Sequence, residues 1–173
     1  FEDSTMKSIF QNILSWFFRV GDFNSEIKGM TNKIVEASLQ IYKQIQVDLK
    51  PTPLKSHYTF NLRDFSKVIQ GICLVRKNEI ENADQMMRLW AHETTRVLGD
   101  RLINDDDRMW MLHAIADTTK VSLGANFDLL FKHLDKTGNG KIESLDEYRG
   151  NIFGDIFTAF GIPDRPYEEI MDK

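Results

Sequence analysis

Residues 51–71 read PTPLKSHYTFNLRDFSKVIQG, and this stretch decides how the rest of the chain is interpreted. Pro51 and Pro53 cannot continue a helix and push the preceding residues toward extended backbone, so we expect a connector over residues 50–60. Asn61 is a suitable N-cap for the segment that follows. That segment carries an apolar stripe at helical spacing: Leu62, Phe65, Ile69 and Ile72. A stiff connector that leads into a short amphipathic helix is therefore predicted.

Upstream of the connector, apolar side chains recur every three or four residues over two segments. Residues 5–18, TMKSIFQNILSWFF, follow the capping candidates Asp3 and Ser4, and one face of this segment is apolar. After a turn around residues 21–24, residues 27–49 repeat the pattern at greater length. Both segments are predicted to form amphipathic helices.

Downstream, the same spacing predicts helices over residues 82–102 and over residues 127–134. Between them a further helix is predicted, which Asn104 caps and which begins with the acidic turn DDD. A Gly-rich loop follows, and residues 152–157 indicate one more helix. The tail beyond is expected to be irregular. No alternation of period two is long enough to indicate a sheet. The predicted fold class is all-α, a helical bundle with a short extended connector and an irregular C-terminal tail.

Composition excludes several classes of partner. The net charge of −4 comes from 26 acidic and 22 basic side chains without a basic block, so nucleic acid is a poor candidate partner. No apolar run approaches the roughly 20 residues of a membrane span, and the start, FEDSTMK, does not resemble a secretory leader. The single Cys73 indicates a buried thiol in a reducing compartment. We therefore expect a cytoplasmic protein without membrane contact, and the initial Phe1 suggests a piece of a longer chain.

Three runs of sequence resemble one known family. KSHYTFNLRDFSKVIQG at 55–71, RLWAHETTRVLGDRLINDDDR at 88–108 and IFGD at 152–155 are similar to the lid of the third AAA+ module in axonemal dynein heavy chains. The similarity is strong over most of residues 30–108 and hardly present over residues 109–150. It implies an AAA+ C-terminal lid fold within a ring of modules that couples nucleotide binding to movement along microtubules. The implied location is a ciliary or flagellar axoneme.

The resemblance also implies a division of the chain and a set of partners. Residues 1–50 would lead from the large AAA+ subdomain into the lid, residues 51–134 would form the lid bundle, and residues 135–173 would contain a loop, a short helix and a linker toward the next module. The expected partners are the remaining heavy-chain ring modules and, through the intact motor, the microtubule.

ATP or ADP is expected to bind only through the intact module. The chain has no GxxxxGK[ST] loop and no apolar strand ending in paired acids, so it is not expected to hydrolyse ATP alone. In AAA+ proteins an Arg near the start of a lid helix reaches the phosphates beneath it, and Arg63 matches that place. A forked guanidinium suits this role because it stays charged and is well oriented for phosphate. The alternative is a surface Arg that pairs with Asp64 or Asp100.

A second constellation has the spacing of an EF-hand calcium loop, with Gly140 at the turn position. The candidate ligand positions are Asp135, Thr137, Asn139, Lys141, Glu143 and Asp146. Asp146 replaces the usual long Glu, and two lysines oppose a cation. The alternative is a Gly-rich turn in which Asp135 and Asn139 accept hydrogen bonds from local backbone N–H groups. If the loop binds calcium, the alternative function of the chain is that of an EF-hand-like calcium-binding helical module.

The remaining candidate sites are weaker. The string from His92 to Arg96 lacks the second histidine of a zinc-binding HExxH motif. Trp16, Trp90 and Trp110 all fall within helical apolar patterns and are predicted to pack in the core.

Overall fold

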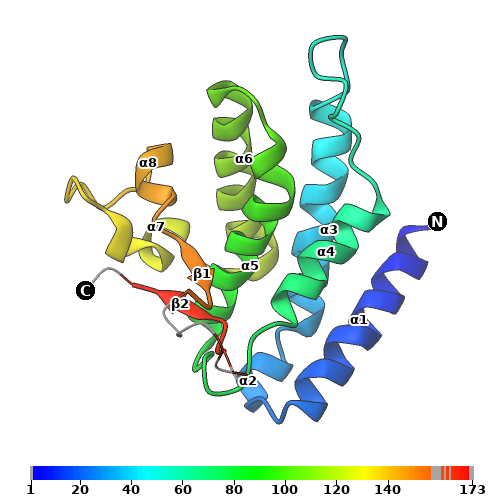
Figure 1. Ribbon diagram of the computed structural model, residues 1–173, viewed down its shortest axis with the longest axis vertical. Coiled ribbons are helices and arrows are strands. Elements are labelled where there is room, and N and C mark those ends of the chain that lie inside the picture. Colours follow the sequence, from blue (N-terminus) through cyan, green and yellow to red (C-terminus); the bar gives the residue numbers. More distant parts are fainter. Residues whose placement is uncertain (1, 157–160, 162, 164, 172–173) are drawn as a thin grey trace.

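The helix α3 (Thr31–Asp48) is the element around which the others pack in this computed structural model (Figure 1). It contacts α1 (Asp3–Val20), α4 (Leu62–Ile72), α5 (Ala83–Leu98) and α6 (Asp105–Thr118). The structure describes residues 2–156, 161, 163 and 165–171. Its architecture confirms the predicted helical bundle. No helix in these described ranges is both long enough and apolar enough to cross a membrane.

The centre of the bundle is formed by one face of α3 and the facing residues of α5. Trp90 on α5 is fully buried, and its indole N–H donates to the Ser38 hydroxyl at 3.0 Å. Ser38 in turn donates to the Ile34 carbonyl at 2.7 Å. The one polar atom of this large side chain is therefore satisfied in the core, where an unmade hydrogen bond would be costly.

The helix α1 lies along the outer side of α3 and α4 (Figure 1). Its inward face contacts α4 through Phe10, whose ring meets that of Phe65 edge to face at 4.7 Å between centroids. The outward face carries an exposed apolar stripe: Ile9, Ile13, Trp16 and Val20. The prediction that Trp16 packs in the core is therefore wrong, since its side chain points away from α3 and is 57 % exposed. Trp90 is buried as predicted, and Trp110 is partly buried against the core.

Several predicted helices are shorter in the structure. The segment 27–49 divides into α2 (Ser25–Lys28), capped by Asn24, and α3, because the chain turns at Gly29 and Met30. The segment 82–102 ends as a helix at Leu98 and continues as the 3₁₀ turn η1 (Gly99–Arg101).

Beyond α6 the helical elements are short. A π turn, η2 (Thr119–Leu123), ends at Gly124, whose positive φ of 71° reverses the chain at low cost. The segment 127–134 forms only α7 (Phe127–Leu130) and the 3₁₀ turn η3 (Lys132–Leu134). The last helix, α8 (Leu145–Tyr148), begins after Ser144, whose hydroxyl accepts from the Glu147 N–H at 3.2 Å.

The predicted helix over residues 152–157 is wrong for the part that the structure describes. Ile152–Gly154 is the strand β1, which pairs antiparallel with β2 (Glu168–Ile170), and Ile152 lies opposite Ile170. Residue 157 lies outside the described residues. The side chains of β1 alternate, with Ile152 exposed and Phe153 buried, as expected for a strand over one apolar surface. The described tail is thus irregular except for β2.

Candidate functional site

The start of α4 is held by a complete capping box. The side-chain oxygen of Asn61 accepts from the N–H groups of Arg63 at 2.9 Å and Asp64 at 3.4 Å. In return, the Asp64 carboxylate accepts from the Asn61 N–H at 3.0 Å. This reciprocal pair satisfies N–H groups that have no partner inside the helix. The predicted cap is confirmed, and the first turn of α4 is rigid.

Arg63 lies in that first turn and is exposed. Asp64 is buried and pairs with Arg101 at 2.9 Å instead of with Arg63. Asp100, the other acid considered for Arg63, lies near His92, Arg96 and Arg108. Within the described part of the chain, the Arg63 guanidinium has neither an ion pair nor a side-chain hydrogen bond, so it is available to a group outside the bundle.

The connector before α4 is fixed by contacts with η1 and α6. Tyr58 is buried, and its hydroxyl donates to Asp107 Oδ2 at 2.7 Å and accepts from the Ile103 N–H at 3.0 Å. Lys55 also pairs with Asp107, and this hydrogen bond raises the pKa of Lys55. Burial raises the pKa of Tyr58, so the phenol keeps the proton that it donates.

Arg101 forms the second anchor of the connector. Its guanidinium donates to the carbonyls of His57 at 2.9 Å and Thr59 at 3.3 Å, and it lies over the Phe60 ring at 4.9 Å. The Arg101 carbonyl is 3.0 Å from His57 Nε2. These contacts, in addition to Pro51 and Pro53, make the connector stiff. Sequence reasoning assigned no role to Arg101 and interpreted Asp107 as negative charge at a helix start. It did not find their contacts with the connector, because both residues lie far along the chain from the residues that they hold.

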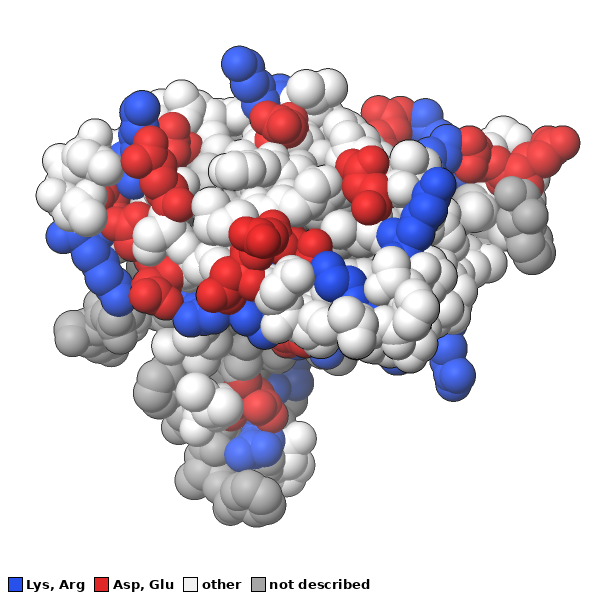
Figure 2. Space-filling view, turned by 90° about the horizontal axis from the view of Figure 1, so that it is seen from above, with Lys and Arg blue, Asp and Glu red and all other residues white. Residues whose placement is uncertain are grey.

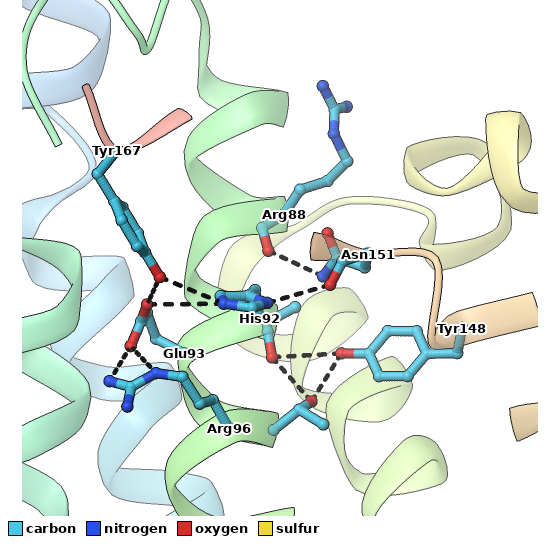
Figure 3. Close-up of polar contacts among 9 residues, drawn as sticks. Arg88, His92, Glu93, Arg96, Tyr148, Asn151 and Tyr167 are labelled. Atoms are coloured by element: carbon cyan, nitrogen blue, oxygen red, sulfur yellow. Dashed lines mark hydrogen bonds and ion pairs between the residues drawn. The ribbon is translucent and has the colours of Figure 1, made fainter. Parts of the chain in front are cut away.

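A buried polar network joins α5 to the C-terminal hairpin (Figure 3). Glu93 is fully buried, and it accepts from Arg96 Nη2 at 2.6 Å and Nε at 2.9 Å, and from the Tyr167 hydroxyl at 2.5 Å. His92 Nδ1 lies 3.1 Å from the Asn151 carbonyl. Burial lowers the pKa of His92 and raises that of Tyr167, which favours the neutral form of both.

One turn earlier on α5, Arg88 extends the same attachment. It holds Glu169 on β2 through two hydrogen bonds, of 2.5 Å from Nε and 3.0 Å from Nη2. The Asn151 side-chain amide donates to the Arg88 carbonyl at 3.0 Å. The described part of residues 135–173 therefore packs directly on α5, although the division of the chain at residue 134 stays a prediction.

Comparison with known proteins matches residues 6–108 to the family described as "Dynein heavy chain, ATPase lid domain". This segment contains the connector, the capped start of α4 and all of α5. The chain belongs to the dynein heavy chain family. Its helical bundle is the family's ATPase lid, as the resemblance implies.

The relatives support the same assignment over a longer range. The lid chain is 43 % identical to the mouse protein "Dynein axonemal heavy chain 12" over 173 residues, which is 99 % of this chain and 6 % of that protein. It is 39 % identical to human "Dynein axonemal heavy chain 6" over 98 % of this chain and 4 % of that protein. For the Chlamydomonas reinhardtii "Dynein-1-beta heavy chain, flagellar inner arm I1 complex" the identity is 33 % over 78 % of this chain and 3 % of that protein. The chain thus spans a small fraction of these relatives.

The EF-hand-like loop of the dynein lid is closed by its own hydrogen bonds. Asp135 accepts from the backbone N–H groups of Thr137 at 3.1 Å, Gly138 at 2.7 Å and Gly140 at 2.7 Å, and these bonds lower its pKa. Asn139 accepts from the Lys141 N–H at 2.8 Å. The alternative prediction of a turn held by Asp135 and Asn139 is confirmed.

The other predicted calcium ligands point to different partners. Asp146 pairs with Arg149 at 2.8 Å, and Glu143 lies 3.6 Å from Lys141. No group of three or more acidic, histidine or cysteine side chains among the described residues is arranged to hold a metal ion. Calcium binding by this loop stays a prediction, and no observation in the described structure favours it.

Calorimetric titration tests this loop. Because Asp135 already accepts from backbone N–H groups and lysines flank the site, we expect no saturable heat at roughly millimolar calcium. Asp135→Asn is the control that removes the central carboxylate. Saturable heat in the natural protein that disappears in Asp135→Asn would restore the EF-hand interpretation.

The face of the molecule seen in Figure 2 carries charge of both signs, as the mixed charge of the sequence leads one to expect. Figure 2 shows the face at the top of Figure 1, where acidic and basic side chains are interspersed without a broad basic area. Such a face has no continuous basic surface that could bind the phosphate backbone of a nucleic acid.

Proposed function

We propose that this chain is the lid of the third AAA+ module of an axonemal dynein heavy chain, and that Arg63 contacts the phosphates of nucleotide bound to the preceding large subdomain. The observation that carries the proposal is the exposed guanidinium of Arg63 on a rigid, capped helix start, without a partner in the described chain. Its neighbours Asp64 and Arg101 pair with each other, so Arg63 is left for a ligand from outside.

The chemistry of this contact follows from the residue type. Bound ATP or ADP would supply clustered negative charge, and a guanidinium stabilises that charge through paired hydrogen bonds. The N-terminus of α4 carries a partial positive charge, which also favours a bound phosphate. Because the capping box fixes the backbone of Arg63, little further ordering is needed when phosphate binds.

We infer that the same contact relays nucleotide state. A change at Arg63 moves the start of α4, and the connector is hydrogen-bonded to η1 and α6. Movement of α4 would therefore carry α5 and α6 with it and reach the neighbouring ring modules as a rotation of the lid. Through the intact motor this acts on the microtubule in a ciliary or flagellar axoneme. Nucleic acid and membrane have no place in this function, and the chain alone is not a catalyst.

Substitution of Arg63 in the intact heavy chain tests the proposal. We expect Arg63→Ala to lower nucleotide affinity of the module by roughly 10-fold or more, because a charge-assisted hydrogen bond to phosphate is lost. The measurement is nucleotide binding together with ATP-dependent microtubule gliding.

Lys67→Ala is the matched control, since it removes an exposed positive charge one turn further along α4. Its nucleotide affinity is expected to equal that of the natural protein. Unchanged affinity and gliding in Arg63→Ala would refute the role of Arg63.

A further inference from the structure

Arg101 occupies a position that links three parts of the bundle. It lies at the end of η1, directly after α5, and its side chain is 31 % exposed. Its guanidinium reaches the connector through the carbonyls of His57 and Thr59 and reaches α4 through Asp64. A planar fork with several N–H donors suits such a branched attachment, whereas a lysine ammonium would satisfy fewer of these acceptors in fixed directions.

The contact with Asp64 is the part that bears on Arg63. The same oxygen of Asp64, Oδ2, accepts from the Asn61 N–H at 3.0 Å and forms an ion pair with Arg101 Nη1 at 2.9 Å. The Asn61 side chain accepts from the Arg63 N–H. Arg101 and the two capping residues are therefore joined by an ion pair and hydrogen bonds into one unit that also holds the backbone N–H of Arg63.

The connector that precedes α4 is also held to the helical bundle by residues of α6 and α3. Tyr58 and Lys55 are attached to Asp107 in the first turn of α6, and the Phe60 carbonyl accepts from Gln46 of α3 at 2.8 Å. The chain thus enters α4 along one defined path. Loss of the Arg101 side chain would leave these other anchors in place and would remove its own contacts, which are those with the His57 and Thr59 carbonyls and the one with Asp64 at the helix start.

We propose that Arg101 is a positioning residue for Arg63: it fixes the direction in which the first turn of α4 presents that guanidinium to phosphate, and it couples this turn to α5 and η1. The inference rests on the proposed phosphate contact of Arg63 and adds the residue that controls it. Arg101 itself does not touch the nucleotide.

Hydrogen exchange in the intact heavy chain tests the positioning directly. In Arg101→Ala the amides of residues 61–65 are expected to exchange roughly 10-fold faster, while those of α3 keep their protection. Arg101→Lys keeps the charge beside Asp64 and should give a smaller increase. Arg108→Ala, which removes an Arg from an exposed pair with Asp105, is the matched control and should leave residues 61–65 unchanged. Unchanged exchange in Arg101→Ala, or faster exchange throughout the bundle in both Arg101 variants, would overturn the inference.

A double-mutant cycle of Arg63 and Arg101, measured by nucleotide affinity, separates this inference from the proposed function. If Arg101 acts through Arg63, Arg101→Ala lowers nucleotide affinity in the natural background by roughly 3- to 10-fold and has no further effect in the Arg63→Ala background. An Arg63→Ala variant with normal affinity would refute the phosphate contact, whereas the exchange measurement would still decide whether Arg101 holds the start of α4. Reduced affinity in Arg63→Ala with normal affinity in Arg101→Ala would refute the positioning role alone. Equal losses from Arg101→Ala in both backgrounds would also refute it.

Discussion

Gly71→Ala is expected to destabilise the lid by about 3 kcal/mol, measured as the free energy of unfolding in urea. Gly71 lies in α4 where this helix packs against α5, and a Cβ at this position would lie 1.9 Å from Glu93 Oε2. Glu93 cannot move away easily, because Arg96 and Tyr167 hold its carboxylate. The substitution therefore separates the two helices or breaks the network.

The sign of this effect is informative, because alanine normally favours a helix over glycine by about 1 kcal/mol. Gly29→Ala is the control, since its Cβ would meet nothing closer than the Ser25 carbonyl at 3.4 Å. That variant is expected to stay within about 0.5 kcal/mol of the natural protein. In addition, Glu93→Ala should cost less in the Gly71→Ala background than alone, because there it also removes the carboxylate that clashes with the new methyl group. Equal stability of Gly71→Ala and the natural protein would contradict the close approach seen here.

The helices around the core were predictable because their apolar stripes are long. The repeat over α3 spans several turns, so its period identifies a helix even though the chain breaks at Gly29. The strands β1 and β2 have three residues each, too few for an alternating pattern to be recognised. Their formation depends on the pairing of Ile152 with Ile170 and on burial of Phe153, which are tertiary contacts.

At the candidate site, too, contacts between residues close in sequence were predictable and contacts that depend on folding were not. The Asn61 cap was predictable because its partners lie two and three residues away. The pair of Arg101 with Asp64 was not, because it forms only when η1 and α4 are brought together by folding. A glycine within a helical pattern, as at Gly71, is a local signal of a close approach, but only the structure shows that the neighbour is the buried Glu93.

The exposure of Trp16 shows a limit of periodicity. The stripe of α1 that holds this side chain is apolar and lies next to the buried stripe, so the pattern does not distinguish the two faces. Only the position of α3 and α4 decides which face is covered.

Arg96→Ala is expected to cost about 2–3 kcal/mol of unfolding free energy, because it leaves the fully buried Glu93 carboxylate without its cation. The Arg96 side chain is 47 % exposed, which places the expected cost at the lower end of the range for broken buried pairs. Arg149→Ala provides a matched comparison, since Arg149 also pairs with an acid three residues earlier, Asp146, but both side chains are mostly exposed. Its expected change is within about 0.5 kcal/mol.

A second substitution distinguishes a stranded charge from lost packing at Arg96. If the cost of Arg96→Ala arises from the uncompensated carboxylate, Glu93→Gln in that background should restore part of the stability, because the amide carries no charge and can still bond the Tyr167 hydroxyl. If the cost arises from the aliphatic part of Arg96, the amide will restore nothing. Recovery should be accompanied by renewed protection of the hairpin amides near Tyr167, because this residue joins the hairpin to Glu93. Failure of both would show that the hairpin is held by Arg88 and Glu169 instead of by the carboxylate of Glu93.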